Sequence, residues 1–479
     1  MLFRHWIAIT IVATFLTQTN GWISLGWSTG FPRRAHEANS ALPRTVRIRT
    51  ELTDVPTSYI ERRDILASVA ACAIGNTFAK NANALDNLAT NERQQYALKF
   101  PTLFAPLYGE AYRKTIKRTI GGAVTGSSNN NNNNNATMMT TTTTNNNTIW
   151  ALEQNLELGP LQTPVRCTVV RLNDGTLWVH SPLAPTQEFF DLVESCGSSQ
   201  DRNSVAHVVV PTYALEHKVF VKDALQRWPN AQLWTSPQQF SFPFHVSDDF
   251  VFGKAVDGVL DSSDSSKIPP WSDEIEYSSL QGGTFNIGGK PTTLCETAFF
   301  HKASKSLIVT DAVAQISKSV PPLNDPEQLL LISKRSTSDP MPDDTPKARL
   351  DGWEKTALLV SYFFPEHEEF DPEKTGVVTW TEGWHDNFNA LAGRLIVPPV
   401  VRTLIYAQNP TRVQQWVNRV ERWDFEQIVP AHFEAPVAAT PKEFSRAFSF
   451  LQDDSIDAFP KNDLARGLQP IADIALKRL

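Results

Sequence analysis

Residues 121–149 form an Asn- and Thr-rich segment that divides the chain into two unequal parts. The stretch from Gly121 to Thr148 holds no charged residue and little apolar material, and it contains the runs Asn129–Asn135 and Thr140–Thr144. A segment of this composition cannot bury a core, so it is predicted to be a disordered linker. Residues 150–479 therefore have to build a core of their own, and the first 120 residues form a separate leader.

The leader begins with the composition of two targeting signals. Residues 1–21 are typical of a signal peptide, because Arg4 precedes an apolar run from Trp6 to Leu16. Residues 22–60 are rich in Arg and poor in acids, as plastid transit segments are. Together they resemble the two-part presequence of nucleus-encoded proteins in algae with secondary plastids.

A third signal is expected in residues 61–84. They contain the pair Arg62-Arg63 and end in Ala82-Asn83-Ala84, a pattern typical of a twin-arginine thylakoid signal. The leader predicts a plastid protein in the thylakoid lumen, with the stroma as the alternative. Its expected partners are the import and twin-arginine translocation machineries. Residues 85–120 are predicted to be a helical segment with a solvated basic end.

Charge is distributed unevenly along the chain. The whole chain has 44 Lys and Arg against 51 Asp and Glu, a formal net charge of -7. Residues 1–120 hold 15 of the basic and 8 of the acidic residues, so residues 150–479 hold 29 and 43 and carry -14. Such an acidic part predicts no nucleic-acid partner. No run reaches the ~18 apolar residues of a spanning helix, so no integral membrane segment is expected in the mature protein.

Four predicted strands lead to side chains that ligate metals in other proteins. The strands are residues 176–179, 207–210, 306–310 and 427–430, and they lead to His180, to Glu216 and His217, to Asp311 and to His432. Imidazole and carboxylate groups are ligands of zinc, iron and manganese. Strand ends can hold such groups in fixed geometry. A single strand-end His is more often structural, but the recurrence at four strands favours a metal site.

Two helix starts are also marked in the C-terminal part. Asn409-Pro410 and Thr440-Pro441 each combine a capping side chain with a Pro at the first helical position. The acidic run Glu366–Glu369 is interpreted as solvated surface. A serine hydrolase is not expected, because the chain has no GxSxG motif and Ser181 is followed by Pro.

This order of strands and polar residues resembles the metallo-β-lactamase fold, an αββα sandwich of two mixed β-sheets flanked by helices. The HxHxDH motif of that fold matches residues 212–217, where Glu216 stands at the Asp and His217 matches the final His. The resemblance implies that Asp311 is the late strand-end Asp and His432 the final loop His. His180 falls near the Asp of the early strand-end motif.

Several segments are similar to one branch of this superfamily, a plant, algal and cyanobacterial family known only as a domain of unknown function. The similar segments are Leu215–Phe220, Ala298–Lys302, Trp423–Glu426 and His432–Ala439. The resemblance covers about residues 160 to 455. It is specific for the family and implies no particular activity.

The chain departs from the motif in the half that binds the first metal. Thr212 and Ala214 replace the first two His, and no Gly-His-Thr turn precedes Asp311. Glu296 and His301 are the candidates to replace the His of that turn. What remains resembles one metal position, for a single Zn, Fe or Mn ion, made by Glu216, His217, Asp311 and His432.

Two functions stay open at this point. The first is a mononuclear metal-dependent hydrolase that uses a metal-bound water on a small ester, thioester or phosphoester, with Asp311 or Glu216 as ligand or general base. The second is a metal-free pseudoenzyme that acts as a scaffold or binds a small ligand, which the departures from the motif favour. A diiron redox protein needs more ligands than the sequence offers.

Overall fold

The computed structural model describes residues 114–120, 148–158, 161–198, 204–239, 247–261, 267–287, 290–371, 374, 377–452 and 459–476. The predicted targeting segments 1–21, 22–60 and 61–84 lie outside the described residues. So do the predicted helical segment up to residue 113 and the linker from residue 121 to 147.

The first of two large sheets has seven strands in sequence order. They are β1 (Ile116–Thr119), β2 (Ile149–Leu158), β3 (Leu161–Arg171), β4 (Leu177–His180), β5 (Val205–Val210), β6 (Gln232–Thr235) and β7 (Gly258–Val259). Pairing is antiparallel from β1 to β4 and parallel from β4 to β7. The parallel half aligns the carboxyl ends of β4 and β5, from which the first site residues follow.

The second sheet has five strands in the order β16-β15-β10-β9-β8. They are β8 (Ile275–Ile287), β9 (Lys290–His301), β10 (Ser306–Val309), β15 (Gln427–Pro430) and β16 (Val437–Ala438). The long β8–β9 hairpin and the β9–β10 pair are antiparallel, whereas β10 and β15 pair in parallel. Asp311 and His432 therefore follow strands that end at the same edge of this sheet.

The two sheets pack face to face through an apolar layer. Trp178 and Val209 from the first sheet share one buried cluster with Phe299, Ile308 and Val429 from the second. Alternate residues of the same strands point the other way, because successive side chains of a strand face opposite sides. These outward residues join a second buried cluster that includes the helices.

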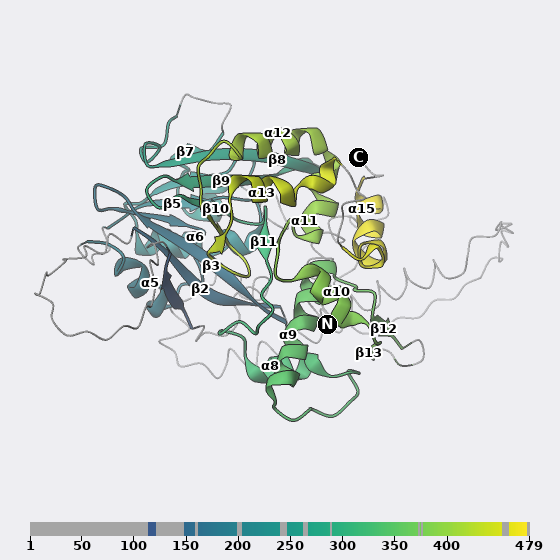
Figure 1. Ribbon diagram of the computed structural model, residues 1–479. Coiled ribbons are helices and arrows are strands. Elements are labelled where there is room, and N and C mark those ends of the chain that lie inside the picture. The colour runs from purple at the N-terminus through teal and green to yellow at the C-terminus, as the bar shows by residue number, and fades with distance from the viewer. Residues whose placement is uncertain are drawn as a thin grey trace, which may run out of the picture.

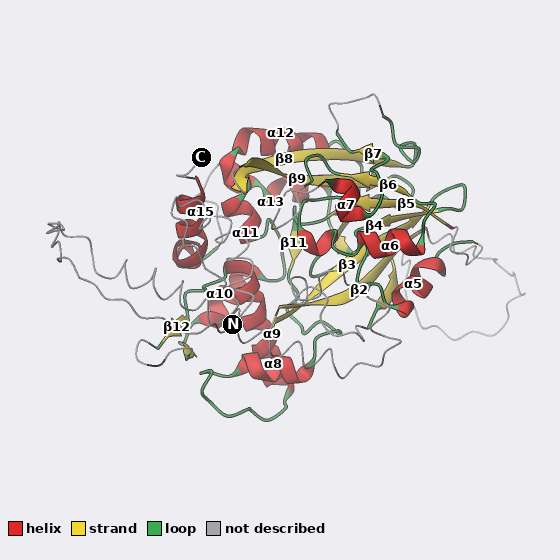
Figure 2. Ribbon diagram, turned by 180° about the vertical axis from the view of Figure 1, so that it is seen from behind, coloured by secondary structure: helices red, strands yellow, loops and turns green. Residues whose placement is uncertain are grey.

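Helices cover both outer faces of the sandwich (Figures 1 and 2). On the side of the first sheet they are α5 (Gln187–Glu194), α6 (Val221–Arg227) and α7 (Asp248–Phe252), and on the side of the second sheet α12 (Pro410–Val420) and α13 (Pro441–Ala447). This is an αββα sandwich of the metallo-β-lactamase type, so the predicted fold class is confirmed. Among the described residues, no helix combines the length and apolar character that crossing a bilayer requires.

Both predicted helix starts are confirmed. The Asn409 side chain accepts a hydrogen bond from the Arg412 amide at the start of α12. Thr440 and Glu443 form a reciprocal capping box at the start of α13. The apolar face of α12 is anchored on the second sheet, where Trp416 Nε1 donates to the Ser278 carbonyl of β8 at 3.0 Å.

Further helices gather at one end of the sandwich (Figures 1 and 2). They are α8 (Pro326–Ser333), α9 (Pro346–Tyr362), α10 (Trp384–Leu391), α11 (Pro399–Leu404), α14 (Lys461–Asp463) and α15 (Gln469–Leu476). Two small two-stranded sheets are formed by β11 (Ala314–Gln315) with β14 (Leu395–Ile396) and by β12 (Glu368–Phe370) with β13 (Val378–Trp380).

Two predicted boundaries are corrected by the first sheet. The helical prediction for residues 85–120 is wrong at its end, because Ile116–Thr119 is strand β1 and pairs with β2 through Lys117 opposite Leu152. Ile149 was assigned to the linker but starts β2 and is fully buried. The globular domain therefore includes a strand from before the Asn/Thr-rich segment and does not start at residue 150.

Candidate metal centre

The loop after β5 carries Glu216 and His217 to the seam between the two sheets. The Thr297 amide of β9 donates to the Pro211 carbonyl at 3.0 Å, and Thr212 Oγ1 donates to the Cys295 carbonyl at the same distance. These bonds attach the start of the loop to the second sheet. The loop then turns through a short 3₁₀ segment, Leu215–His217, so that the imidazole of His217 is fully buried.

His432 and its neighbouring residues are held against β3 of the first sheet by hydrogen bonds. Its Nδ1 donates to the Pro164 carbonyl at 3.0 Å. The fully buried guanidinium of Arg166 donates to the carbonyl oxygens of Pro430 and Phe433, two residues before and one after the imidazole. Arg166 is itself paired with Glu153, 2.7 Å from its Nε. The loop after β15 is thus clamped to β3.

Asp311 follows β10 and lies beside the imidazoles of His217 and His432, which come from the loops after β5 and β15. Its Oδ1 lies 3.5 Å from His432 Nε2 and 3.9 Å from His217 Nε2. The backbone just before it is tied down, because the buried carboxylate of Glu296 accepts the Thr310 amide at 2.8 Å. Glu296 therefore positions Asp311 from the neighbouring strand β9.

The two imidazoles point at each other. His217 Nε2 and His432 Nε2 are 3.1 Å apart, and ligand atoms of Glu216, His217 and His432 all lie within 4.8 Å of one another. Two nitrogen ligands of a tetrahedral zinc ion at 2.0–2.1 Å would be about 3.3 Å apart. The spacing therefore fits two imidazoles on one metal ion, with carboxylates beside it.

The hydrogen bonds of the two Nδ1 atoms show that the Nε2 atoms of His217 and His432 face this centre. A carbonyl oxygen only accepts, so His432 carries its proton on Nδ1, toward Pro164, and Nε2 presents a lone pair. Ser181 Oγ lies 2.8 Å from His217 Nδ1 and 3.4 Å from the His217 carbonyl oxygen, so it holds Nδ1 as a hydrogen-bond donor or acceptor. The 3.1 Å separation fits either a proton shared by the two Nε2 atoms or a metal ion between them.

Backbone strain marks both sides of the centre. Ser181 has φ 58° and Phe433 has φ 59°, in the left-handed region that non-Gly residues rarely adopt. Such positions cost about 1–3 kcal/mol and cluster at functional sites. Here one of them places the hydroxyl that contacts His217, and the other directly follows His432.

The ionisation states follow from burial and neighbouring charges. Burial lowers the pKa of His432 to about 4, so this imidazole stays neutral. Burial opposes ionisation of Asp311, but the imidazoles of His217 and His432 outweigh it and hold the pKa of the carboxyl below its usual range. Burial raises the pKa of Glu216, with a smaller contribution from Asp311. The centre thus offers one carboxylate that is readily ionised and one that tends to hold a proton.

The additional ligand candidates lie elsewhere. His180 is buried between the sheets, stacked on Trp178 with ring centroids 5.6 Å apart, and burial lowers its pKa to about 3. Within the described part of the chain, neither of its nitrogens has a hydrogen-bond partner. His180 is not in the convergent group, so the prediction that it is a ligand is not supported.

His301 is at the wrong end of the sheet. It pairs with Ser306 at the start of β10, and its Nδ1 lies 2.7 Å from Ser304 Oγ. Asp311 comes five residues after Ser306, which places it about 17 Å further along the strand direction. The prediction that His301 replaces the third His is therefore wrong. Glu296 does reach the Asp311 loop, as a backbone acceptor rather than as a member of the convergent group.

A small recess lies beside Asp311. Its lining includes Tyr213, Leu294, Glu296, Asp311, Ile405 and Tyr406. Burial, with the nearby Glu296 and Asp311, raises the pKa of Tyr406 well above its usual range, so the phenol keeps its proton. The recess and the convergent imidazoles share Asp311.

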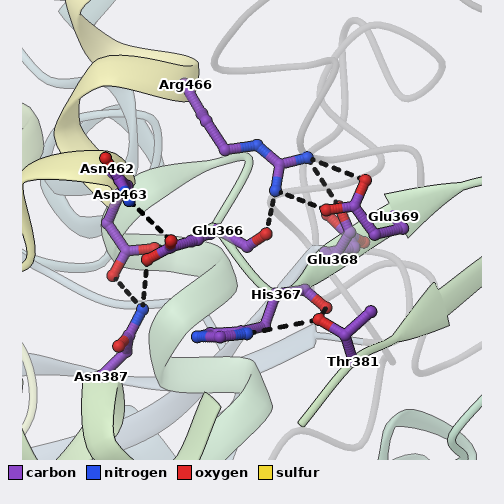
Figure 3. A network of polar contacts seen from close by, with 9 residues as sticks. All are labelled: Glu366, His367, Glu368, Glu369, Thr381, Asn387, Asn462, Asp463 and Arg466. Carbon is purple, nitrogen blue, oxygen red and sulfur yellow. Dashed lines mark hydrogen bonds and ion pairs between the residues drawn. The ribbon is translucent and has the colours of Figure 1, made fainter. Parts of the chain in front are cut away.

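The acidic run Glu366–Glu369 serves to dock the C-terminal helices (Figure 3). Arg466 donates to the Glu366 carbonyl and pairs with Glu369 at 2.9 Å. Asp463 accepts hydrogen bonds from the Glu366 amide at 2.6 Å and from Asn387 at 2.9 Å. These mutual contacts give the run a structural role, and it is more buried than the predicted solvated surface, since Glu368 is 4% exposed.

A second group with metal-ligand chemistry lies on α9 and α10, formed by Asp351, Glu354 and His385. His385 Nδ1 is 2.7 Å from Glu354, and Lys347 Nζ is 2.7 Å from Asp351. Each carboxylate is therefore already engaged by a neighbouring side chain. The imidazole of His385 is 49% exposed, unlike the buried imidazoles of the centre.

Comparison with known proteins identifies the family. The family described as "Domain of unknown function (DUF4336)" matches residues 146–450, more than half of the chain. The chain belongs to this family. The match includes the four residues of the centre and ends just after α13, so the C-terminal helices are additional to it. A comparison with curated proteins gives no match.

Solved structures of similar fold are distant in sequence. A metallo-beta-lactamase from Pontibacter korlensis is 12% identical, with 64% of this chain and 95% of that chain covered and a TM-score of 0.30. A variant of a flavo di-iron protein from Thermotoga maritima is 11% identical, with 63% and 58% covered and a TM-score of 0.32. The flavodiiron protein from Giardia intestinalis is 10% identical, with 60% and 51% covered and a TM-score of 0.32. Similarity at this level carries no information on activity.

Proposed function

We propose that the protein is a metal-dependent hydrolase with a single divalent ion, held by His217, His432, Asp311 and Glu216. The observation that carries this proposal is the 3.1 Å separation of two Nε2 atoms whose Nδ1 atoms are both hydrogen-bonded elsewhere. Two imidazoles with carboxylates form a donor set for Zn, Fe or Mn. The donor set and its spacing thus fit such an ion.

When bound, a divalent ion supplies a Lewis acid and lowers the pKa of a coordinated water toward about 7. The chain's own residues would orient the ion and move protons. Asp311 is 24% exposed and ionised, so it can accept a proton at Oδ1 or ligate the ion. Burial raises the pKa of Glu216, so where Glu216 does not ligate the ion it can hold a proton and return it to a leaving group. Ser181 and Arg166 keep the two imidazoles in place.

Metal analysis of the full chain tests the proposal. Protein purified after growth with added zinc, iron and manganese should carry about one ion per chain. His217→Ala and Asp311→Ala should lose the ion, whereas the matched control His385→Ala, in the exposed group, should retain it. A folded parent without a stoichiometric ion would remove the basis for a hydrolase.

A second candidate is a metal-free protein that binds a small ligand or serves as a scaffold. Thr212 favours it, because the side chain at this motif position is directed to the Cys295 carbonyl and has a structural bond there. In that case His217 would hold a proton toward Asp311 in place of the ion. The metal analysis separates the two candidates.

We also propose that the protein acts in a plastid, in the thylakoid lumen or alternatively in the stroma. The composition of residues 1–84 supports this proposal. Protease treatment of thylakoids after import should leave the processed protein intact, and replacing Arg62 and Arg63 by Lys should block this protection. Unchanged processing of the Lys variant would contradict delivery to the lumen.

A further inference from the structure

We propose that Lys218 and Gln239 are positioning residues for the metal centre, which hold the loop that carries Glu216 and His217 in its ligating conformation before an ion binds. The inference rests on the proposed function, because it concerns how the same site is preformed. Neither side chain is among those proposed to ligate the ion or to move a proton.

The side-chain amide of Gln239 joins the two ends of this loop. Its Nε2 donates to the carbonyl of Thr212, at the start of the loop, at 3.2 Å. Its Oε1 accepts a hydrogen bond of 3.2 Å from Nζ of Lys218, the residue directly after His217. Because an amide can donate and accept at the same time, one side chain closes the loop from both ends.

The same amide is attached to the edge of the first sheet. Gln239 Nε2 lies 2.7 Å from Ser236 Oγ and 3.2 Å from the Ser236 carbonyl oxygen. The Ser236 amide in turn donates to the Val210 carbonyl of β5 at 2.8 Å. Strands β5 and β6 pair in parallel up to Val210 and Thr235, so the contact that closes the loop is held by a rigid element.

Burial makes this network specific. Thr212, Lys218, Ser236 and Gln239 are all 8% exposed or less. Burial lowers the pKa of Lys218 to about 7, but the ammonium and the neutral amine can both donate to Gln239, so the hydrogen bond does not depend on the charge. In a buried network each lost partner leaves another polar group unsatisfied, and such networks therefore favour one arrangement.

The backbone before Gln239 is a second, independent observation. Gln238 has φ 54°, in the left-handed region that non-Gly residues rarely adopt. Such a conformation persists only where the surrounding contacts determine it. Ser181 and Phe433, which flank the centre from β4 and β15, have the same kind of backbone. The turn that delivers the Gln239 amide is thus constrained in the same way as the other supports of the centre.

Two substitutions in the full chain test the proposal against a matched control. Lys218→Met and Gln239→Leu each remove one side of the contact and nearly keep the side-chain volume. Lys355→Met is the control, because Lys355 is also 2% exposed and its Nζ donates to two carbonyl oxygens, those of Ser333 and Lys334. It lies on α9 and has no contact with the loop among these hydrogen bonds.

The first measurement is amide hydrogen exchange in the chelator-treated, metal-free chain. The amides of Lys218 and Val219 both donate to the Leu215 carbonyl, at 3.0 and 2.9 Å, so they exchange when the loop opens. The peptide that contains them should exchange at least about fivefold faster in both loop variants, the equivalent of one hydrogen bond. It should exchange at the parental rate in Lys355→Met.

The second measurement is zinc affinity in competition with a chromophoric chelator. Each loop variant should bind zinc about tenfold or more weakly, as is usual when a contact that orients a ligand is lost. The double variant should be no weaker than Gln239→Leu alone, because the two side chains form one contact. The visible spectrum of the cobalt-loaded chain, which reports the geometry of the ligands, should change in the loop variants and not in Lys355→Met.

Parental exchange in Lys218→Met and Gln239→Leu would overturn the inference, and so would faster exchange with parental zinc affinity. An equal loss of zinc affinity in Lys355→Met would overturn it as well, since the effect would then be one of general stability. All three results leave the proposed metal site in place. A parent chain that binds no ion would instead refute the proposed function itself, so the two failures are distinguishable.

Discussion

Removal of one hydroxyl from Ser181 should weaken the metal site without dismantling the fold. Ser181 Oγ lies 2.8 Å from His217 Nδ1, and both side chains are fully buried. In Ser181→Ala, Nδ1 of His217 loses this hydrogen-bond partner at a cost of about 1–3 kcal/mol. Loss of such an outer hydrogen bond typically lowers metal affinity about 10- to 100-fold. We expect a loss in this range.

Ser181→Gly provides the matched control. It removes the same hydroxyl but relieves the left-handed backbone at φ 58°, which costs a residue with a Cβ about 1–2 kcal/mol. Both variants should therefore lose metal affinity equally in a competition titration against a chromophoric chelator. In urea unfolding without metal, the Gly variant should be more stable than the Ala variant by about 1 kcal/mol.

The result that would refute this reasoning is parental metal affinity in both variants. It would mean that the Ser181 hydroxyl does not orient His217, and that the contact is only packing. Equal metal affinity with equal unfolding free energies would refute only the part that concerns backbone strain.

Three further predictions concern the framework around the centre. Arg166→Met leaves Glu153 with Arg118 as its ion-pair partner and removes the donor to the Pro430 and Phe433 carbonyls. It should lower the unfolding free energy by about 2–3 kcal/mol, and an unchanged urea midpoint would contradict the clamp. His207 and His301 have pKa values lowered to about 4 by burial, so the unfolded chain takes up protons first. The contribution of each His to stability should be constant above pH 6.5 and fall by about 3 kcal/mol as the pH decreases to 4, and variants with Gln at either position should flatten this fall in urea titrations. Thr440→Ala removes a capping box and should cost about 1 kcal/mol in the same assay, with no effect on metal content.

The ends of the core strands could be predicted from the sequence because each is a β-branched run stopped by a turn residue. The predicted strands 306–310 and 427–430 correspond to β10 and β15, and their parallel pairing brings Asp311 and His432 to one edge. The two helix starts can also be predicted from the sequence, because a capping side chain and a Pro act on the residues next to them. The fold class followed from the resemblance and from these elements together.

The alternation of a strand explains why Ser181 was missed and His180 favoured. In β4 the side chains of Trp178 and His180 share the face toward Phe299 of the second sheet. The next residue, Ser181, leaves the strand with positive φ, and its hydroxyl contacts His217. Residue type alone makes an imidazole a better candidate for a metal ligand than a hydroxyl. Only the direction in which each side chain leaves the strand shows that Ser181, and not His180, reaches the centre.

Contacts between distant segments could not be predicted. Arg166 and Phe433 are 267 residues apart in sequence, and nothing local to Arg166 shows that it clamps the His432 loop. The sequence predicts a helix where β1 lies, because the contact that defines this strand is also between distant segments. Its four residues are defined by pairing with β2, beyond the Asn/Thr-rich segment, and not by their own periodicity.

Anomalous diffraction from crystals grown with zinc is the most direct test of the central claim. We predict one strong peak between His217 and His432, about 2 Å from both Nε2 atoms and beside Asp311. A peak only at Asp351, Glu354 and His385, or no peak between the two imidazoles in a zinc-replete crystal, would contradict it.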